Sequence, residues 1–336
     1  MSDLPSVAII MPAYNASHLL GRSLTAALVA AKDQKVLVVD PGSTDDTADV
    51  ARNIGADVIR LEKRAGPAHA RNVGVRHVDT DIVLFIDSDC VAHPDVVDRV
   101  REAFQDPELV SLTGSYDDTP PEQNFFSLYM NLRHHFTHQR ANTEDASFWA
   151  GCGAVRRTVY EQIGGFDAEQ FPMPMIEDIE LGLRLRPKGK TRLDPKLHVT
   201  HLKKWTFKSV VSTDIKNRAI PWTRLILATG QMPNDLNLRL SQRVAAALAP
   251  FVLGGLAVAP PLFLTGMFPL GAAALAPAAV SAVMHSEMIG WCNQVRGPSF
   301  AARFWLFHQV HLVYSAATFV WCQLEHRIRP RTAAAT

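Results

Sequence analysis

The chain has 336 residues, a formal net charge of +1 and a hydrophobic fraction of 47%. This length allows one α/β domain of ordinary size plus a further segment, and the near-neutral charge gives no indication of nucleic-acid or polyanion binding. The four cysteines are scattered and form no C-x-x-C pair, which argues against structural zinc and a disulfide framework and fits a reducing compartment. Asp3 precedes the first apolar run, so we expect no secretory signal at this end.

The first 90 residues alternate between short apolar strands and amphipathic helices. Three helices are expected. The first begins at about Ser17, the second follows a turn in which Ser43 or Thr44 is the expected N-cap, and the third begins after Gly66. Strands are expected at Val7–Met11, Lys35–Val39, Asp57–Leu61 and Asp81–Ile86. This alternation predicts βαβ units with right-handed crossovers and a mostly parallel sheet.

The fourth strand ends in two carboxylates, Asp87 and Asp89, which are separated by Ser88. Its continuous apolar run is typical of a strand buried on both faces, and ligands bind at the carboxyl ends of such strands in open α/β folds. Adjacent carboxylates repel each other unless a cation lies between them, and Mg²⁺ or Mn²⁺ prefers oxygen ligands and shares them with substrate phosphates. The alternative is an ordinary loop of solvated acids.

A second acidic pair, Glu177 and Asp178, begins a predicted helix whose Leu181 and Leu185 face inward. Carboxylates at a helix N-terminus are stabilised by the helix dipole, so capping alone could explain the pair. Between the two acidic centres, a further strand is expected at Leu109–Gly114.

A helix with three histidines and a glycine-rich segment follow that strand. The helix is expected over Phe125–Arg140, and its histidines favour a surface or an interface over a metal site because no carboxylate accompanies them. Glycines flank Cys152 at positions 151 and 153, where they would permit close backbone approach to a ligand.

Five motifs occur in a characteristic order over about residues 5–205. They are P-A-Y-N at 12–15, V-V-D-x-G-S-T-D at 38–45, A-R-N-x-G at 70–74, D-S-D at 87–89 and E-D-I-E-L-G-L-R-L-R at 177–186. Together they strongly resemble the family 2 glycosyltransferases. The resemblance implies an α/β GT-A fold, which is a Rossmann-like mixed sheet that binds nucleotide-diphospho-sugars. It also implies sugar transfer from such a donor, with a UDP-sugar favoured, and inversion at the anomeric carbon.

The resemblance implies that the loop after the first strand frames the nucleobase, through Pro12, Ala13, Tyr14 and Asn15. A tyrosine ring offers a face for stacking, and Asp40 can accept a hydrogen bond from a base N–H. The chain departs from the family where many relatives have a second acid, because Pro41 occupies that position. The base contact then depends on Asp40.

The same resemblance assigns expected roles in the reaction. Arg71 would neutralise diphosphate charge, and Asp87 and Ser88 would contact the donor. The expected ligands of Mg²⁺ or Mn²⁺ are Asp87, Asp89 and His201, with His198 as the competitor of His201. The glycine-rich segment (Gly151, Cys152 and Gly153) would line the donor sugar and the acceptor. Asp178 would be the general base, and Glu177 would support the acceptor or orient Asp178.

A general base favours a hydroxyl acceptor over a phosphate acceptor, because a phosphate is already ionised near neutral pH. Two alternatives stay open: transfer to polyprenyl phosphate, and a catalytically silent membrane-anchored protein that binds nucleotide sugars. Nucleotide hydrolysis is disfavoured because the chain has no G-x-x-x-x-G-K loop.

The chain becomes basic after the catalytic region, which we expect to span residues 1–205. Residues 206–243 are expected to form a basic amphipathic segment on an anionic membrane surface, because aromatic residues are interleaved with the cations. The basic residues of this part of the chain are Lys203, Lys204, Lys208, Lys216, Arg218, Arg224, Arg239 and Arg243.

Residues 244–286 contain no charged side chain, which predicts two membrane helices at about 244–264 and 267–285. A further apolar block at 304–324 is either a third span or a surface helix, and Trp305 and Trp321 at its ends favour a span. The region 244–336 thus predicts a multi-pass protein of a bacterial cytoplasmic (inner) membrane, with the catalytic domain in the cytoplasm. The expected acceptor is a hydroxyl of a lipid or membrane-held glycan, with membrane lipids as partners and no nucleic acid.

Overall fold

The computed structural model describes residues 4–230 and 240–328. The chain divides into two compact units, Met1–Phe207 and Lys208–Thr336. The division lies two residues beyond the predicted end of the catalytic region, and each unit is described below by itself.

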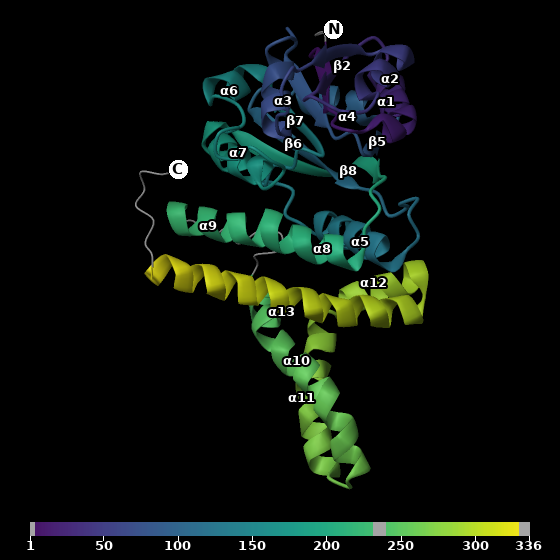
Figure 1. Cartoon of the computed structure of the whole chain (residues 1–336), viewed down its shortest axis with the longest axis vertical. Coiled ribbons are helices and arrows are strands. Elements are labelled where there is room, and N and C mark those ends of the chain that lie inside the picture. Colours follow the sequence, from purple (N-terminus) through teal and green to yellow (C-terminus); the bar gives the residue numbers. More distant parts are fainter. Residues whose placement is uncertain (1–3, 231–239, 329–336) are drawn as a thin grey trace. The chain divides into compact units, whose positions relative to one another are not determined.

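The first unit contains the expected α/β alternation (Figure 1). Its strands are β1 (Val7–Pro12), β2 (Lys35–Asp40), β3 (Asp57–Arg60), β4 (Ile82–Ile86), β5 (Cys90–Ala92), β6 (Leu109–Tyr116), β7 (Cys152–Arg156) and β8 (Lys190–His201). Its helices are α1 (Ser17–Ala31), α2 (Thr47–Ile54), α3 (Pro67–Val75), α4 (Val96–Ala103), α5 (Phe125–Gln139), α6 (Arg157–Gln162), α7 (Glu177–Leu185) and the short 3-10 helix η1 (Arg186–Lys188). The predicted strands, and the helices predicted from Ser17, after Gly66 and over Phe125–Arg140, are therefore confirmed to within one or two residues.

The strands form one mixed sheet of eight strands in the order β3-β2-β1-β4-β7-β6-β8-β5. The first four strands along the chain pair in parallel, as the βαβ pattern predicts. Strand β7 then pairs antiparallel with β4, so that Cys152 lies opposite Ile86. Strand β5 pairs antiparallel with β8, so that Cys90 lies opposite His201. These antiparallel pairings bring late parts of the chain to the carboxyl end of β4.

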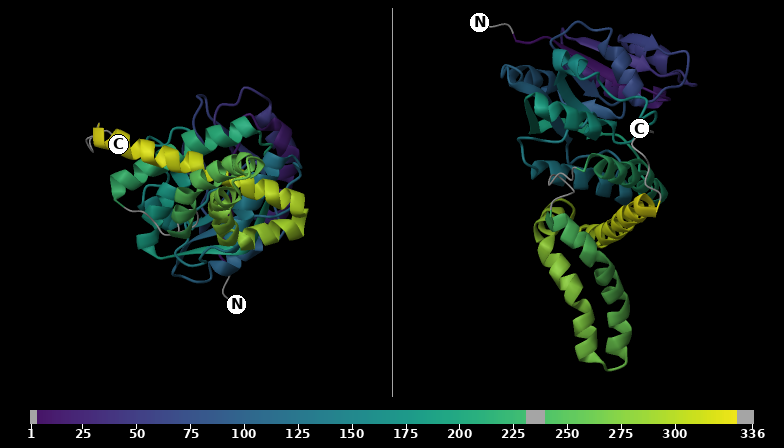
Figure 2. Two further views of the ribbon diagram at one scale, coloured as in Figure 1. Left: turned by 90° about the horizontal axis from the view of Figure 1, so that it is seen from below. Right: turned by 90° about the vertical axis from the view of Figure 1, so that its left-hand side faces the viewer.

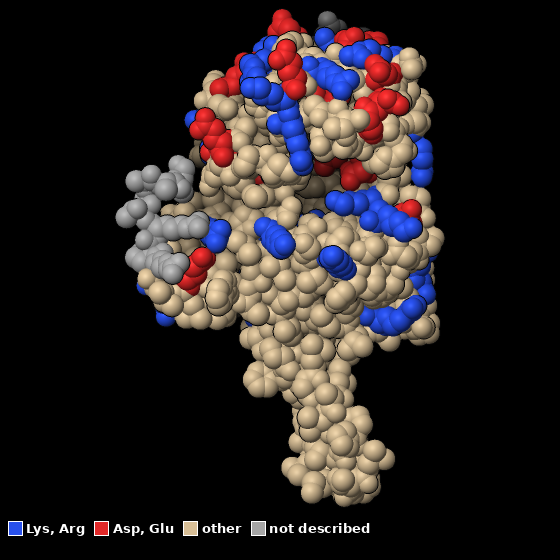
Figure 3. All heavy atoms as spheres, viewed as in Figure 1, with Lys and Arg blue, Asp and Glu red and all other residues tan. Residues whose placement is uncertain are grey.

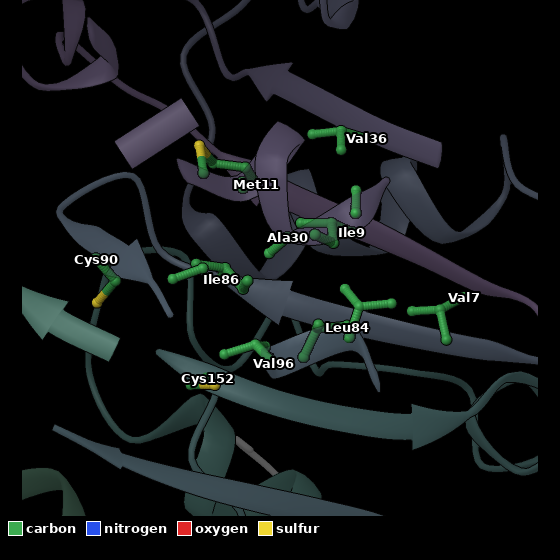
Figure 4. Packing of buried hydrophobic residues seen from close by; sticks show 14 of the residues in the cluster. Val7, Ile9, Met11, Ala30, Val36, Leu84, Ile86, Cys90, Val96 and Cys152 are labelled. Carbon is green, nitrogen blue, oxygen red and sulfur yellow. The ribbon is translucent and has the colours of Figure 1, made fainter. Parts of the chain in front are cut away.

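Apolar clusters pack against both faces of this sheet, because β1 and β4 are buried on both sides. One cluster joins alternate residues of these strands to α1 and α4 (Figure 4). The other cluster packs α3, α6 and α7 on the opposite face, around Phe85. Alternation of side chains along a strand explains how the single run Ile82–Ile86 serves both clusters.

The turn before α2 differs from the prediction. Neither Ser43 nor Thr44 caps this helix, which begins at Thr47 after Asp46 without a side-chain cap hydrogen bond. The Ser43 hydroxyl instead accepts a hydrogen bond from the Asn15 amide. The polar side chains of this turn are used to join two loops at the edge of the sheet rather than to start a helix.

The second unit is helical and contains one described π-helix. Its elements are α8 (Phe207–Thr213, which begins at the unit boundary), the π-helix η2 (Asp214–Ala219), α9 (Ile220–Thr229), α10 (Leu240–Leu264), α11 (Phe268–Met284), α12 (Ser286–Arg296) and α13 (Pro298–Ile328). Residues 231–239, which include Arg239 of the predicted basic segment, lie outside the described residues. Helices α10 and α11 lie side by side as a hairpin (Figure 2), and the visible face of this hairpin carries almost no charged side chains (Figure 3).

Among the described helices, α10 is long and apolar enough to cross a membrane, with a mean hydropathy of 1.9. A second crossing is possible only if α11 and α12 count as one span, although the chain bends by 71° between them. Helix α13 contains the block 304–324 but is not among the candidate spans, so the expectation of a third crossing is not supported. A physical reason is that α13 carries His308, Gln309 and His311 within that block.

The hairpin generates a prediction, because α10 and α11 meet backbone to backbone at Gly255. A Cβ atom there would collide with the carbonyl oxygen of Ala274, whereas nothing lies within 4 Å of a Cβ at Gly254. Gly255→Ala should lower the free energy of unfolding by about 1–3 kcal/mol, as overpacking does. Gly254→Ala should be neutral or stabilising by up to about 1 kcal/mol. The measurement is thermal unfolding of the full chain in detergent. Equal melting temperatures for the two variants would contradict this packing.

Candidate active site

Arg71, on α3, joins the two acidic centres that the sequence places about 90 residues apart. Its Nη2 atom lies 2.6 Å from Oδ1 of Asp87, and its Nη1 atom lies 3.3 Å from Oε1 of Glu177. The Arg71 side chain is only 4% exposed, and its Cζ atom lies 5.2 Å from the centre of the Phe166 ring. From the sequence we expected Arg71 to neutralise diphosphate charge. In the structure its guanidinium contacts the two carboxylates.

Glu177 and Asp178 are the first two residues of α7, and their surroundings differ. Glu177 is buried, and besides Arg71 it accepts a hydrogen bond from the Met175 amide at 2.8 Å. Asp178 is half-buried and accepts hydrogen bonds from two amides, that of Ile179 at 2.8 Å and that of Ala150 at 3.4 Å. The charge of Glu177 is therefore compensated by Arg71, whereas Asp178 accepts hydrogen bonds from neutral backbone amides.

Burial and the negative charge of Glu177 raise the pKa of Asp178 to about 7, against the smaller opposing effect of Arg71. A carboxyl group with this pKa exchanges a proton near neutral pH, which suits a general base or acid. Asp178 is therefore the group at this site whose electrostatics match the expected base.

Asp89 lies immediately before β5, next to His201, the last residue of β8. Its Oδ2 atom is 3.5 Å from Nε2 of His201. Burial would raise the pKa of Asp89, but His201 and Lys203 lower it to about 2, so the carboxylate is ionised. His198 points elsewhere, with its ring centre 5.6 Å from that of His93. The structure thus brings His201 and not His198 to the D-S-D motif, while Ser88 lies half-buried between the two acids.

The donor set at this point fits a divalent ion only in part. Among the described residues, no group of three or more histidine, cysteine, aspartate or glutamate side chains is arranged to hold a metal ion. Asp89 and His201 form a pair, and the Asp87 carboxylate is engaged by Arg71. Mg²⁺ commonly takes one or two protein carboxylates and completes its shell with water and substrate phosphates, so this pair is compatible with such an ion.

Asp40 occupies the position expected for a base contact, at the end of β2. It is fully buried, and its Oδ1 atom accepts a hydrogen bond from the Ser43 amide at 2.7 Å. Its Oδ2 atom has no hydrogen-bond partner among the described residues and lies 3.7 Å from Nε of Arg60. An open pocket of about 320 Å³ is lined by Gly42, Ser43, Arg60, Leu61 and Glu62, and of these Ser43 and Arg60 are the neighbours of Asp40, which does not itself line the pocket.

The loop after β1 is fastened to the turn after β2. Ala13 is buried and donates its amide hydrogen to the Val39 carbonyl oxygen. Asn15 has a positive φ of 48°, and its side-chain oxygen accepts a hydrogen bond from the Thr44 amide. Tyr14 follows Pro12 and Ala13, and its ring lies under the Arg64 guanidinium at 5.0 Å. The P-A-Y-N residues therefore belong to the same sheet edge as Asp40.

The glycines around Cys152 have a structural explanation within the chain. A Cβ atom at Gly151 would collide with the Trp149 indole, and one at Gly153 would collide with the Phe148 ring. Cys152 itself is fully buried as the first residue of β7. The space that the missing glycine side chains leave is thus filled by neighbouring aromatic rings. This packing holds the Trp149 side chain in place, and the next residue, Ala150, donates its amide hydrogen to Asp178.

Several residues at the site were missed by sequence reasoning. Tyr116 and Trp149 pack together with ring centres 4.7 Å apart, and Tyr116 also stacks on His201. Asn72, the neighbour of Arg71, donates a hydrogen bond to the Phe166 carbonyl and accepts one from the Tyr160 hydroxyl. Only Asn72 carried a signal, because it lies within the A-R-N-x-G motif.

The Arg71 bridge generates a stability prediction. Arg71→Met would leave Asp87 and Glu177 without their cation, which should cost about 3–5 kcal/mol of unfolding free energy. Arg52→Met is the matched control, because Arg52 pairs with Asp49 at the surface and should change stability by less than about 1 kcal/mol. Denaturant unfolding of the full chain checks both values, and equal losses would show that the buried bridge is unimportant.

Comparisons with known proteins agree with the motifs and the fold. Residues 8–164 match the model of the family described as glycosyl transferase family 2. The validoxylamine A glucosyltransferase of Streptomyces hygroscopicus subsp. jinggangensis is 28% identical over 225 residues, covering 56% of this chain and 53% of that protein. The 4,4'-diaponeurosporenoate glycosyltransferase of Staphylococcus aureus (strain bovine RF122) is 34% identical over 106 residues, covering 30% of this chain and 28% of that protein. This chain spans about half the length of the first of these relatives.

A solved structure gives the same answer for the fold. The mannosyltransferase of Pyrobaculum calidifontis, in complex with GDP-Man and Mn²⁺, superposes with a TM-score of 0.60 at 19% identity. The match covers 95% of this chain and 88% of that one. The five ordered motifs and the mixed sheet agree with these matches: the N-terminal unit of this chain is similar to glycosyltransferase family 2 over residues 8–164 and has the GT-A fold.

Proposed function

We propose that this protein is an inverting glycosyltransferase that moves a sugar from a nucleotide-diphosphate donor, favouring a UDP-sugar, to a hydroxyl acceptor. The observation that carries the proposal is the bridge of Arg71 between Asp87 and Glu177, which joins the D-S-D motif to the start of α7, where Asp178 is the second residue. Donor chemistry and base chemistry can then act on one substrate complex.

The donor would bind along the carboxyl edge of the sheet. Its nucleobase would bind at the pocket whose lining includes Ser43 and Arg60, the neighbours of Asp40, and Oδ2 of Asp40, which has no hydrogen-bond partner among the described residues, would accept a hydrogen bond from a base N–H. Pro12, Ala13, Tyr14 and Asn15 would frame the base. Asp87 and Ser88 would contact the ribose and phosphates, and Gly151, Cys152 and Gly153 would form the wall beside the sugar.

Asp89 and His201, with Asp87 nearby, would hold a divalent ion, Mg²⁺ or Mn²⁺. When bound, this ion would stabilise the negative charge on the departing nucleoside diphosphate. The Mn²⁺ and GDP-Man in the fold relative support a metal-dependent nucleotide-sugar site of this class.

Asp178 would act as the general base. Its carboxylate would take the proton of the acceptor hydroxyl as that oxygen forms a bond to the anomeric carbon. The bond between the anomeric carbon and the diphosphate oxygen breaks on the opposite face, so the configuration inverts. Glu177 would support this step by holding α7 to Arg71 and by raising the basicity of its neighbour.

The proposed acceptor is a hydroxyl of a lipid or membrane-held glycan. Helix α10 is long and apolar enough to cross a membrane, and the name diaponeurosporenoate glycosyltransferase of one relative also supports an acceptor of this kind. The protein would reside in a bacterial cytoplasmic membrane, with cations of the segment 206–243 on anionic lipid and the catalytic unit in the cytoplasm. Sedimentation with liposomes after a carbonate wash tests the attachment, and complete release would exclude it.

Replacing the base tests the reaction most directly. Asp178→Asn keeps the size of the side chain but removes its ability to take a proton, so transfer should fall by at least about 10²-fold. Binding of the nucleotide, measured by calorimetry on the full chain in detergent, should change little. Normal transfer by this variant would exclude Asp178 as the base and would favour an acceptor that is already ionised, such as polyprenyl phosphate.

The pH dependence of the rate follows from the raised pKa of Asp178. The base works only when it is deprotonated, so kcat/KM should rise with pH through an apparent pKa of about 7. Glu177→Gln removes a negative charge that raises this pKa, and it should therefore move the rising limb to lower pH. Initial rates between about pH 5.5 and 9 measure both curves, and a limb that stays in place would argue against this coupling.

A further inference from the structure

Tyr116 lies at the end of β6 and packs on the side chain expected to bind metal. The planes of the Tyr116 and His201 rings differ by 11°, and the ring centres are 4.2 Å apart. Packing of the two ring faces restricts rotation of the imidazole about its side-chain bonds.

His201 has little else to orient it. It is 6% exposed, and Asp89, at 3.5 Å from Nε2, is the one polar side-chain partner found for it within residues 4–230 and 240–328. Metal-binding histidines are usually oriented by a hydrogen bond from the second ring nitrogen. Here no such bond is found in the described part of the chain, so the stacked tyrosine occupies the place of that support.

The next residue fixes the backbone of Tyr116. The amide of Asp117 donates a hydrogen bond to the Val199 carbonyl at 3.0 Å. The buried Asp117 carboxylate accepts hydrogen bonds from the Thr200 hydroxyl and from His93, whose Nε2 atom is 3.0 Å away. These contacts join the end of β6 to β8 and to the residue after β5, and they fix the backbone next to Tyr116.

Tyr116 also contacts the side of the site that holds the base. The Trp149 and Tyr116 rings make a T-shaped contact, with planes at 82° and centres 4.7 Å apart. The residue after Trp149 donates its amide hydrogen to Asp178. One ring is therefore packed between the His201 imidazole and the loop that contacts the base.

We propose that Tyr116 is a positioning residue that holds the His201 ring in the orientation required for binding a divalent cation beside Asp89. This inference rests on the proposed function, because it assumes that Asp89 and His201 hold the ion. The aromatic face of Tyr116 carries the effect, and its hydroxyl is dispensable.

The test measures Mn²⁺ binding to the full chain in detergent, by calorimetry with UDP present. Tyr116→Ile removes the ring but keeps a residue suited to a strand, and it should weaken Mn²⁺ binding by about 10-fold, the lower range for loss of a supporting contact. Tyr116→Phe keeps the ring and should bind Mn²⁺ as the unchanged protein does. In transfer assays, the isoleucine variant should need correspondingly more Mn²⁺ for half-maximal rate.

Controls separate positioning from a general loss of structure. A purely structural role would lower the melting temperature of Tyr116→Ile without metal and leave its Mn²⁺ affinity unchanged, which would overturn the inference. Equal losses in the phenylalanine and isoleucine variants would also overturn it, because the hydroxyl would then be the active group. Tyr116→Met, with a more adaptable side chain, replaces the isoleucine variant if that protein does not fold.

His201→Ala distinguishes failure of this inference from failure of the proposed function. Loss of Mn²⁺ binding in that variant supports the metal site on which the inference depends. Unchanged Mn²⁺ binding would show that the ion binds elsewhere, and would overturn the proposed metal site together with the role of Tyr116.

Discussion

The arrangement of the site depends on one buried cation. Arg71 is enclosed by the sheet, α3 and the Phe166 ring, and its two terminal nitrogens contact Asp87 and Glu177. A charge in such surroundings is tolerated only when partners compensate it. The two carboxylates need the cation for the same reason. The bridge therefore fixes the position of the β4 end relative to the start of α7.

The Arg71 guanidinium compensates the charge of some acids at the site and not of others, and this difference bears on the proposed role of Asp178. Arg71 makes direct contacts with Asp87 and Glu177, whereas Asp178 receives only backbone N–H groups. Burial disfavours the charged form of Asp178, and Glu177 repels a second negative charge, so the pKa of Asp178 is raised to about 7. Two acids adjacent in sequence thus have different partners, because Glu177 contacts the Arg71 guanidinium and Asp178 contacts backbone amides.

The mixed sheet explains how distant segments reach the same edge. A purely parallel sheet would bring together only the loops that follow each strand. Because β7 runs antiparallel to β4, its first residues lie beside the D-S-D motif, and because β5 pairs with the end of β8, His201 lies beside Asp89. The glycines at 151 and 153 admit the Trp149 and Phe148 rings, which pack this part of the chain tightly.

The sequence alone determined the alternation of strands and helices, the resemblance to family 2 glycosyltransferases and the two acidic centres, because periodicity and ordered motifs are local properties. It also located the uncharged region 244–286. Among the described helices of this region, α10 by itself is long and apolar enough to cross a membrane. Tertiary structure decided which groups meet: Arg71 with the carboxylates, His201 instead of His198 with Asp89, and Tyr116 with His201. These contacts join residues far apart in the chain, so they depend on strand pairing and register, which no local pattern encodes.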